Sequence, residues 1–196
     1  MRKGRRLLSS LALALVLVLS FSLPAFAATT ADVTVTAAPS YIAITNDPST
    51  WTINGISGTG KIQPNTTYYA KGSTNETTPP SATVLDAECN FTVTNSSSVN
   101  IDLTVTWGAF TGGGADMTNS NAGTNGATTY GAYCWYSGMT YASKVIVKST
   151  GSTAMLTGMT PATTTKKWGV EILTRTDAWT SGTSSTSTLT ITATAS

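Results

Sequence analysis

The stretch NFTVTNSSSVNIDLTVTWGAF, residues 90–110, shows the alternation of apolar and polar side chains that is typical of β-strands. Apolar residues occupy every second position in Phe91–Val93 and in Val99–Trp107, and a short Asn/Ser segment separates the two runs. Two such runs on either side of a tight turn predict a hairpin of antiparallel strands with one buried face. We expect this hairpin to lie at the centre of a β-sandwich.

Other segments are also predicted to be strands, by alternation or by their aromatic and β-branched residues, and turn-forming residues separate most of them. They comprise residues 31–37, 41–45, 50–54, 66–71, 130–136, 143–149, 154–159, 166–176 and 186–195. No segment beyond residue 27 has helical periodicity. A series of about eight to ten short strands predicts an all-β fold, an antiparallel immunoglobulin-like β-sandwich. A closed barrel is the alternative architecture.

The N-terminus has the three parts of a secretory signal peptide. The basic stretch Arg2–Arg6 precedes a mostly apolar run, Leu7–Leu23, and Pro24–Ala27 supplies a small-x-small cleavage site. We expect residues 1–27 to be the signal peptide and residues 28–196 to form a single β-sandwich domain. A transmembrane anchor is the alternative, but the apolar run is short and a cleavage site ends it. The predicted location is secreted, either extracellular or at the cell surface.

The net charge changes sign if the signal peptide is removed. Four of the eleven Lys and Arg residues would be lost and none of the nine Asp and Glu residues, which leaves a net charge of −2. A nearly neutral chain with few basic residues does not favour nucleic acid or anionic membrane surfaces as partners. Thr favours strands, whereas Ser, Gly and Asn favour turns, so the polar residues fit a hydroxyl-rich extracellular β protein.

The chain contains two cysteines, Cys89 and Cys134, and no His. Because export permits disulfides, we expect a bond between them. It would close a loop of about 45 residues and contribute about 3–4 kcal/mol to stability. Two buried free thiols are the alternative. Two thiolates without a His do not make a zinc site, so no metal or other cofactor is expected.

The sequence offers few groups for catalysis, because the absence of His removes the commonest general base. Asp86 and Glu88 would share a face of a strand and could form a glycosidase pair, although such residues more often lie at a solvated edge. The Gly-rich stretch Thr111–Thr129 is predicted to be a loop. Its residues 116–125 carry oxygen ligands, but Asp116 is the only charged one, so a calcium site is the less favoured alternative. We expect no enzymatic activity.

The aromatic residues divide into expected core residues and expected surface residues. Trp107 and Trp168 are in register with core aliphatics, so we expect them in the core. Trp135, Tyr136 and Trp179 lie next to predicted loops and are the candidates for an exposed platform that stacks on sugars. They support a second functional hypothesis, a carbohydrate-binding or adhesion module. N-x-Ser/Thr sequons, which matter only where the host glycosylates Asn, begin at Asn65, Asn75, Asn90 and Asn95.

The run FTVTNSSSVNIDLTV, Phe91–Val105, resembles an element of bacterial exported immunoglobulin-like domains. In that element a strand ends in Asn, a turn of small residues follows, and a strand returns with D-L-T-V. Fibre proteins of the TasA and camelysin type carry a similar element behind a signal peptide. The run VTVTAAPSYIAI, residues 33–44, is similar to the opening of secreted β-sandwich proteins. The resemblance implies a structural or adhesive role at the cell surface, and it supplies no catalytic residues.

These observations favour a structural protein, a subunit of an extracellular fibre or surface layer. The terminal strands, Ala31–Ala37 and Thr186–Ala195, would leave sheet edges open to a neighbour. An exchanged N-terminal strand with Val33 and Val35 on its buried face would join copies. The expected partners are further copies or other cell-surface proteins, with glycans as the alternative and no membrane span after cleavage. An enzyme and a virion protein are the less favoured readings.

Overall fold

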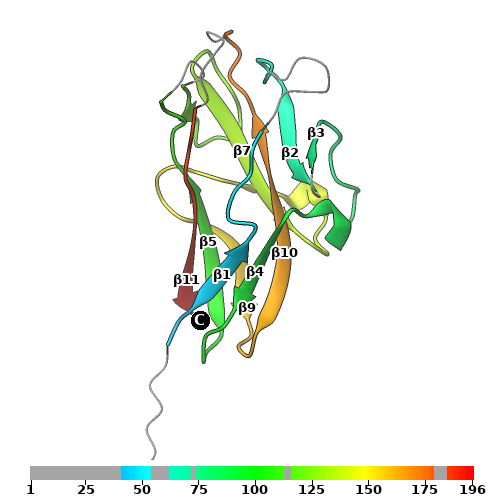
Figure 1. Ribbon diagram of the computed structural model, residues 1–196, viewed down its shortest axis with the longest axis vertical. Helices are drawn as coiled ribbons and strands as arrows, with labels where there is room; N and C mark the ends of the chain where they lie inside the picture. Colours follow the sequence, from blue (N-terminus) through cyan, green and yellow to red (C-terminus); the bar gives the residue numbers. More distant parts are fainter. Residues whose placement is uncertain (1–40, 54–61, 72–73, 113–115, 179–184) are drawn as a thin grey trace, which may run out of the picture. The chain divides into compact units, whose positions relative to one another are not determined.

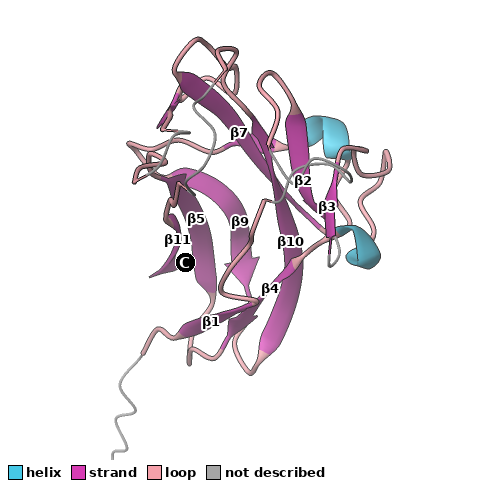
Figure 2. Ribbon diagram, turned by 45° about the horizontal axis from the view of Figure 1, so that its top comes forward, coloured by secondary structure: helices cyan, strands magenta, loops and turns pink. Residues whose placement is uncertain are grey.

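Two antiparallel sheets pack face to face in the computed structural model, which describes residues 41–53, 62–71, 74–112, 116–178 and 185–196 (Figures 1 and 2). These residues belong to one unit, Pro39–Ser196. The strand pairs are antiparallel, apart from one short parallel pair. The predicted all-β sandwich is confirmed. Within the described ranges, no helix is long and apolar enough to span a bilayer.

The larger sheet is built around its longest strand, β10 (Thr164–Leu173). Its other strands are β1 (Ile44–Asp47), β2 (Thr67–Lys71), β3 (Thr74–Glu76), β4 (Phe91–Asn95), β6 (Thr118–Asn119), β7 (Thr129–Tyr136) and β8 (Val145–Ile146). One edge of β10 pairs with β4 and, farther along, with β2, while its opposite edge pairs with β7. β1 lies beyond β4, β3 lies beyond β2, and β6 and β8 pair with β7.

The smaller sheet has three strands, in the order β11 (Leu189–Ala195), β5 (Ile101–Trp107) and β9 (Thr153–Met159). β11 pairs with β5 along its full length of 7 residues and without irregularity. The β5–β9 pair, in contrast, contains register shifts. Two short 3₁₀ helices, η1 (Asp86–Glu88) and η2 (Tyr141–Ser143), lie in the connections.

The prediction of a central hairpin at residues 90–110 is wrong, because β4 and β5 belong to different sheets. β4 pairs with β1 and β10, whereas β5 pairs with β11 and β9. Residues 96–100 therefore form an arch that crosses from one sheet to the other. Alternation correctly identifies the buried side chains of both strands. It does not identify the strand that each one pairs with, since any partner that covers the same face satisfies the pattern.

The side chain of Asn95 fixes this arch. It is fully buried, and its Nδ2 donates hydrogen bonds of 2.9 Å to the carbonyl oxygens of Met159 and Thr160. Its Oδ1 accepts a hydrogen bond of 2.8 Å from the backbone N–H of Ser97. The end of β4 is thereby tied both to its own arch and to the turn between β9 and β10. A buried amide with this many partners satisfies backbone groups that the arch would otherwise leave unpaired.

The core lies between the sheets and receives side chains from both. The rings of Phe91 and Trp168 are tilted by 31° with their centroids 4.7 Å apart, and Trp107 meets Tyr130 edge-on at 5.5 Å. Trp107 and Trp168 are buried, as the sequence predicts. The indole N–H of Trp168 donates to Asn46 Oδ1 at 2.8 Å, so the polar end of this large side chain is also satisfied.

Several predicted strands have different bounds in the structure. The expected strand at 41–45 begins only at Ile44, and residues 51–53 are not a strand. The expected strand at 143–149 is reduced to Val145–Ile146. The predicted first strand, residues 31–37, lies outside the described residues, as does Trp179.

Candidate functional site

A second apolar cluster lies on the face of the larger sheet that points away from the smaller sheet. We call it the outer-face cluster, and its members are Tyr69, Val84, Cys89, Trp135 and Met139. The ring of Trp135 lies at its centre, 6.2 Å from Tyr69 and 5.7 Å from Tyr141. Residues 77–90, which we call the covering segment, contribute Val84 and Cys89. This cluster makes the larger sheet apolar on parts of both faces.

The predicted sugar-stacking platform is wrong at Trp135, whose side chain is 0% exposed. Gly169, its cross-strand partner on β10, provides the space for the indole, because a Cβ at this position would lie 2.6 Å from Trp135 Cζ2. Tyr136 is half-buried and packs against both apolar clusters. Trp179 lies outside the described residues. Neighbouring residues on a strand also point to opposite faces, so Trp135 and Tyr136 do not form one surface.

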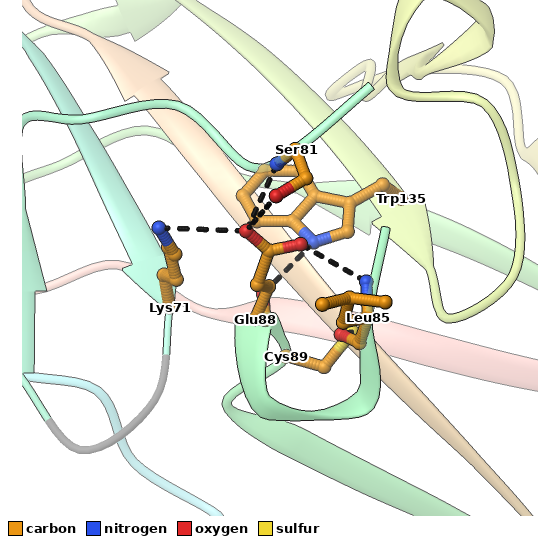
Figure 3. Close-up of polar contacts among 6 residues, drawn as sticks. All are labelled: Lys71, Ser81, Leu85, Glu88, Cys89 and Trp135. Atoms are coloured by element: carbon orange, nitrogen blue, oxygen red, sulfur yellow. Dashed lines mark hydrogen bonds and ion pairs between the residues drawn. The ribbon is translucent and has the colours of Figure 1, made fainter. Parts of the chain in front are cut away.

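Glu88 anchors the covering segment to the sheet (Figure 3). Its Oε1 accepts hydrogen bonds of 2.9 Å from both the backbone N–H and the hydroxyl of Ser81, and its Oε2 accepts one of 3.0 Å from the N–H of Leu85. Lys71 on β2 forms an ion pair with Oε1 at 3.6 Å. The indole N–H of Trp135 donates to the backbone carbonyl of Glu88 at 3.2 Å. The carboxylate thus joins the covering segment to β2, and the backbone carbonyl of the same residue joins it to β7.

Asp86 and Glu88 do not share a strand face as predicted, because both lie in the 3₁₀ helix η1. Asp86 is exposed, whereas Glu88 is buried. Burial favours a higher pKa for Glu88, but the hydrogen bonds from Leu85 and Ser81 and the charge of Lys71 lower its pKa below the usual value. Glu88 is therefore held as an ion whose oxygens are already occupied, which is the environment of a structural carboxylate.

Glu171 on β10 is a second buried carboxylate, and the sequence analysis did not single it out. Its Oε1 lies 2.5 Å from Nζ of Lys144, and the hydroxyl of Tyr141 donates to its Oε2. The Lys144 ammonium also lies 4.5 Å from the centroid of the Tyr133 ring, a cation–π distance. Burial, together with the Glu171 carboxylate, raises the pKa of Tyr141 and keeps its phenol protonated as a donor. The arrangement clamps η2 and the Lys144 segment to β10.

The predicted disulfide is absent, because Cys89 and Cys134 are both free and buried. Cys134 lies in the main core between the sheets, whereas Cys89 belongs to the outer-face cluster. Burial raises the pKa of Cys89 to about 11 and that of Cys134 to about 12. Neither thiol therefore has the thiolate character that nucleophilic or redox chemistry requires. Chain separation alone could not reveal that the sheet lies between them.

The predicted Gly-rich loop contains the short strand β6, and the side-chain amides of Asn119 and Asn121 fasten it to the sandwich. Asn119 is buried, and its Nδ2 donates to the carbonyl oxygens of Trp107 and Val147. Its Oδ1 accepts the N–H of Asn121, whose own Oδ1 accepts the N–H of Ser149. No group of three or more Cys, Asp and Glu side chains in the described part of the chain is placed to hold a metal ion. Asn119 therefore has the same role as Asn95 at the arch: its buried amide bonds backbone carbonyl groups of neighbouring segments.

The sheet edges are the remaining candidates for a functional surface. Within the described residues, β11 pairs only with β5, so its outer edge carries no further strand. Its outward side chains are exposed threonines, at positions 190, 192 and 194, and its inward side chains Leu189, Ile191 and Ala193 are only half-buried. A long, uncharged strand of this kind is open to pairing with another chain.

Both ends of the described sandwich meet at the arch. The N–H of Ser98 donates to the carbonyl of Tyr41 at 3.2 Å, and the N–H of Ser196 donates to the carbonyl of Asn100 at 3.1 Å. The chain therefore enters β1 and leaves β11 at the same end of the sandwich (Figure 1). The assembly candidates Val33 and Val35 precede this point and lie outside the described residues.

The sequons differ in accessibility. Asn95 is fully buried, Asn90 is half-buried and Asn65 is exposed. Asn65 also accepts a hydrogen bond from Asn125 Nδ2 at 3.0 Å. Burial removes Asn95 from consideration as a glycan acceptor in the folded chain.

Comparison with protein-family models, with curated proteins and with solved structures finds no match for this chain. The described residues form an antiparallel β-sandwich in which the outer edge of β11 is long and regular. The functional argument therefore depends on that edge and on the chemistry of the chain.

Proposed function

We propose that the protein is a secreted or cell-surface structural protein, a subunit of an extracellular fibre or surface layer whose copies associate by strand exchange. The observation that carries this proposal is the outer edge of β11, which extends over 7 residues and includes no proline and no charge. Folded β proteins usually protect such an edge with charges, bulges or covering segments. An edge without this protection is suited to adding a strand from another chain.

The sequence supplies a strand of suitable chemistry. If residues 31–37, ADVTVTA, adopt a strand, Val33 and Val35 would lie on one face and Asp32, Thr34 and Thr36 on the other. The signal-peptide pattern before this segment supports export, and the hydroxyl-rich strands suit an extracellular surface. The buried ionisable groups Glu88 and Glu171 are held by hydrogen bonds and ion pairs, which favours a structural role for them. Other cell-surface proteins with a similar strand are further candidate partners.

Glycan binding has less support than self-association. Trp135, the central residue of the expected platform, is buried in the outer-face cluster. Tyr136 is half-buried and carries Lys166 over its ring at 5.0 Å from the centroid. A platform that stacks on sugar rings requires exposed aromatic faces.

Deletion of residues 28–39 tests the proposed function. We expect the full chain without its signal peptide to form oligomers or fibres, and the shortened chain to remain a folded monomer, because the described sandwich begins beyond the deleted segment. Size-exclusion chromatography with light scattering and negative-stain electron microscopy would measure assembly, and circular dichroism would verify folding.

A matched pair of variants tests whether assembly requires the apolar face of residues 31–37 or only the presence of the segment. Replacing both Val33 and Val35 with Asp should prevent assembly, because the charges would have to be buried. Thr34→Asp, on the opposite face, should leave assembly intact. The proposal fails if the full chain stays monomeric at high concentration.

A further inference from the structure

We infer that the outer edge of β11 is the acceptor for residues 31–37 of a second copy, aligned along its full length, so that copies join head to tail. This inference rests on the proposed function and specifies the partner surface. Three observations carry it: the contrast between β11 and the other edges, the partial burial of its inward side chains, and the match with the donor segment.

β11 differs from the other edge strands of the described sandwich. β1 is 4 residues long and ends at Asp47, directly before Pro48, which has no N–H to donate. β3 and β8 are shorter still. β9 is as long as β11, but its pairing with β5 is interrupted by register shifts and Gly158 has a positive φ of 66°. Such irregularities protect an edge, and β11 has none of them.

The inward side chains of β11 are incompletely covered. On the neighbouring strand β5, Leu103 and Val105 are fully buried, whereas Ile191 and Ala193 on β11 are only half-buried. Ile44, at the edge of the opposite sheet, is also half-buried against the core. The core is therefore less completely covered along this side of the sandwich. A strand added beside β11 would cover these side chains with its own apolar face.

The segment 31–37 matches β11 in length and pattern. It has seven residues, the same number as β11, and Ala31, Val33, Val35 and Ala37 all fall on one face. Its opposite face consists of Asp32, Thr34 and Thr36. These residues would extend the exposed threonine surface of β11. When the two segments are aligned along their full length, Thr34 lies opposite Thr192 in either strand direction, because each residue is the middle one of its segment.

The short connection to the sandwich favours addition to a second copy. Three residues, 38–40, separate the segment from Tyr41, which is held at the arch by Ser98. A strand joined to its own β11 would have to cross between sheets roughly 10 Å apart and reverse direction within these residues. Short connections that resist such a reversal favour exchange between copies. The donor and acceptor surfaces differ, so the contact does not close on itself, and repetition produces an open fibre.

Cysteine cross-linking tests this pairing. The full chain without its signal peptide would be prepared as Thr34→Cys, as Thr192→Cys and as the double variant, then oxidised with copper phenanthroline. The native thiols of Cys89 and Cys134 are buried and do not interfere under native conditions. We expect covalent dimers from the mixture of the two single variants, no covalent dimers from either variant alone, and a ladder of covalent multimers from the double variant.

Thr45→Cys provides the matched control, because Thr45 is an exposed, outward-facing threonine on the edge strand β1. A mixture of Thr34→Cys and Thr45→Cys should give no cross-linked dimers. Cross-linking within single chains of the double variant would overturn the inference in favour of self-pairing. Cross-linking to Thr45 would overturn it in favour of the β1 edge. If the unsubstituted chain assembles but no pair cross-links, the inference fails and the proposed function stands; if it does not assemble at all, both fail.

Discussion

The carboxylate of Glu88 shows how much of the outer face depends on one side chain. It accepts hydrogen bonds from Ser81 and Leu85 and pairs with Lys71, so it fastens the covering segment over Trp135. Without it, the backbone N–H groups of Ser81 and Leu85 would lose these hydrogen bonds and Lys71 would lose this ion pair. Removing one partner from such a network costs more than the bonds themselves contribute, because the other groups remain unsatisfied.

Glu88→Gln should therefore lower the free energy of unfolding by about 1–3 kcal/mol at pH 7. The pKa of Glu88 is lower in the folded chain than its usual value of 4.5, so the ionised form stabilises the fold above that pH. This stabilisation is lost as the pH falls through the lowered pKa, and the difference between the two proteins should shrink. Urea unfolding followed by tryptophan fluorescence at pH 7 and at pH 3 would measure it.

Asp86→Asn is the matched control, since Asp86 lies in the same 3₁₀ helix but is exposed. Its effect at pH 7 should be smaller than that of Glu88→Gln. An equal effect of both substitutions, or a Glu88→Gln difference that does not depend on pH, would contradict the anchoring role.

At the scale of the element, the arch between β4 and β5 depends on Asn95. Its amide reaches across to the turn after β9 and back to Ser97. Asn95→Ala should destabilise the fold by about 1–3 kcal/mol, because buried carbonyl and N–H groups lose their partners. Asn100→Ala, in the same arch but with an exposed side chain, should change stability by less than about 0.5 kcal/mol. Equilibrium unfolding in urea would compare the two, and equal effects would argue against the clamp.

The same element shows what a sequence can and cannot predict. Alternation correctly places Val93 and Leu103 in the core, because burial of one strand face requires only a period of two. It cannot predict that β4 and β5 lie in different sheets, since pairing depends on segments far away in the chain, such as β10. The burial of Trp135 cannot be predicted from the sequence around it either, because the space for its ring is provided by Gly169 on another strand. A charged residue within an aliphatic strand, Glu171, was the available signal for the second buried carboxylate.

At the scale of the whole molecule, the two cysteines predict how stability responds to redox conditions. Cys89 and Cys134 are free, belong to clusters on opposite sides of the larger sheet, and have pKa values raised to about 11 and about 12. We expect two thiols per chain to react with Ellman's reagent only after denaturation. The melting temperature should be the same with and without a reductant. If the denatured chain had no reactive thiols, the predicted disulfide between Cys89 and Cys134 would be correct after all.

The arch that receives both ends of the sandwich determines where a fibre of such subunits would bear mechanical load. If neighbouring copies pull on the residues before Tyr41 and on β11, the first load enters the domain at the arch, beside the hydrogen bond from Ser98 to Tyr41. The second load is spread over the seven residue pairs that join β11 to β5, a strand whose side chains lie in the core. Tension between subunits would therefore be borne by both sheets, because β1 belongs to the larger sheet and β11 to the smaller one.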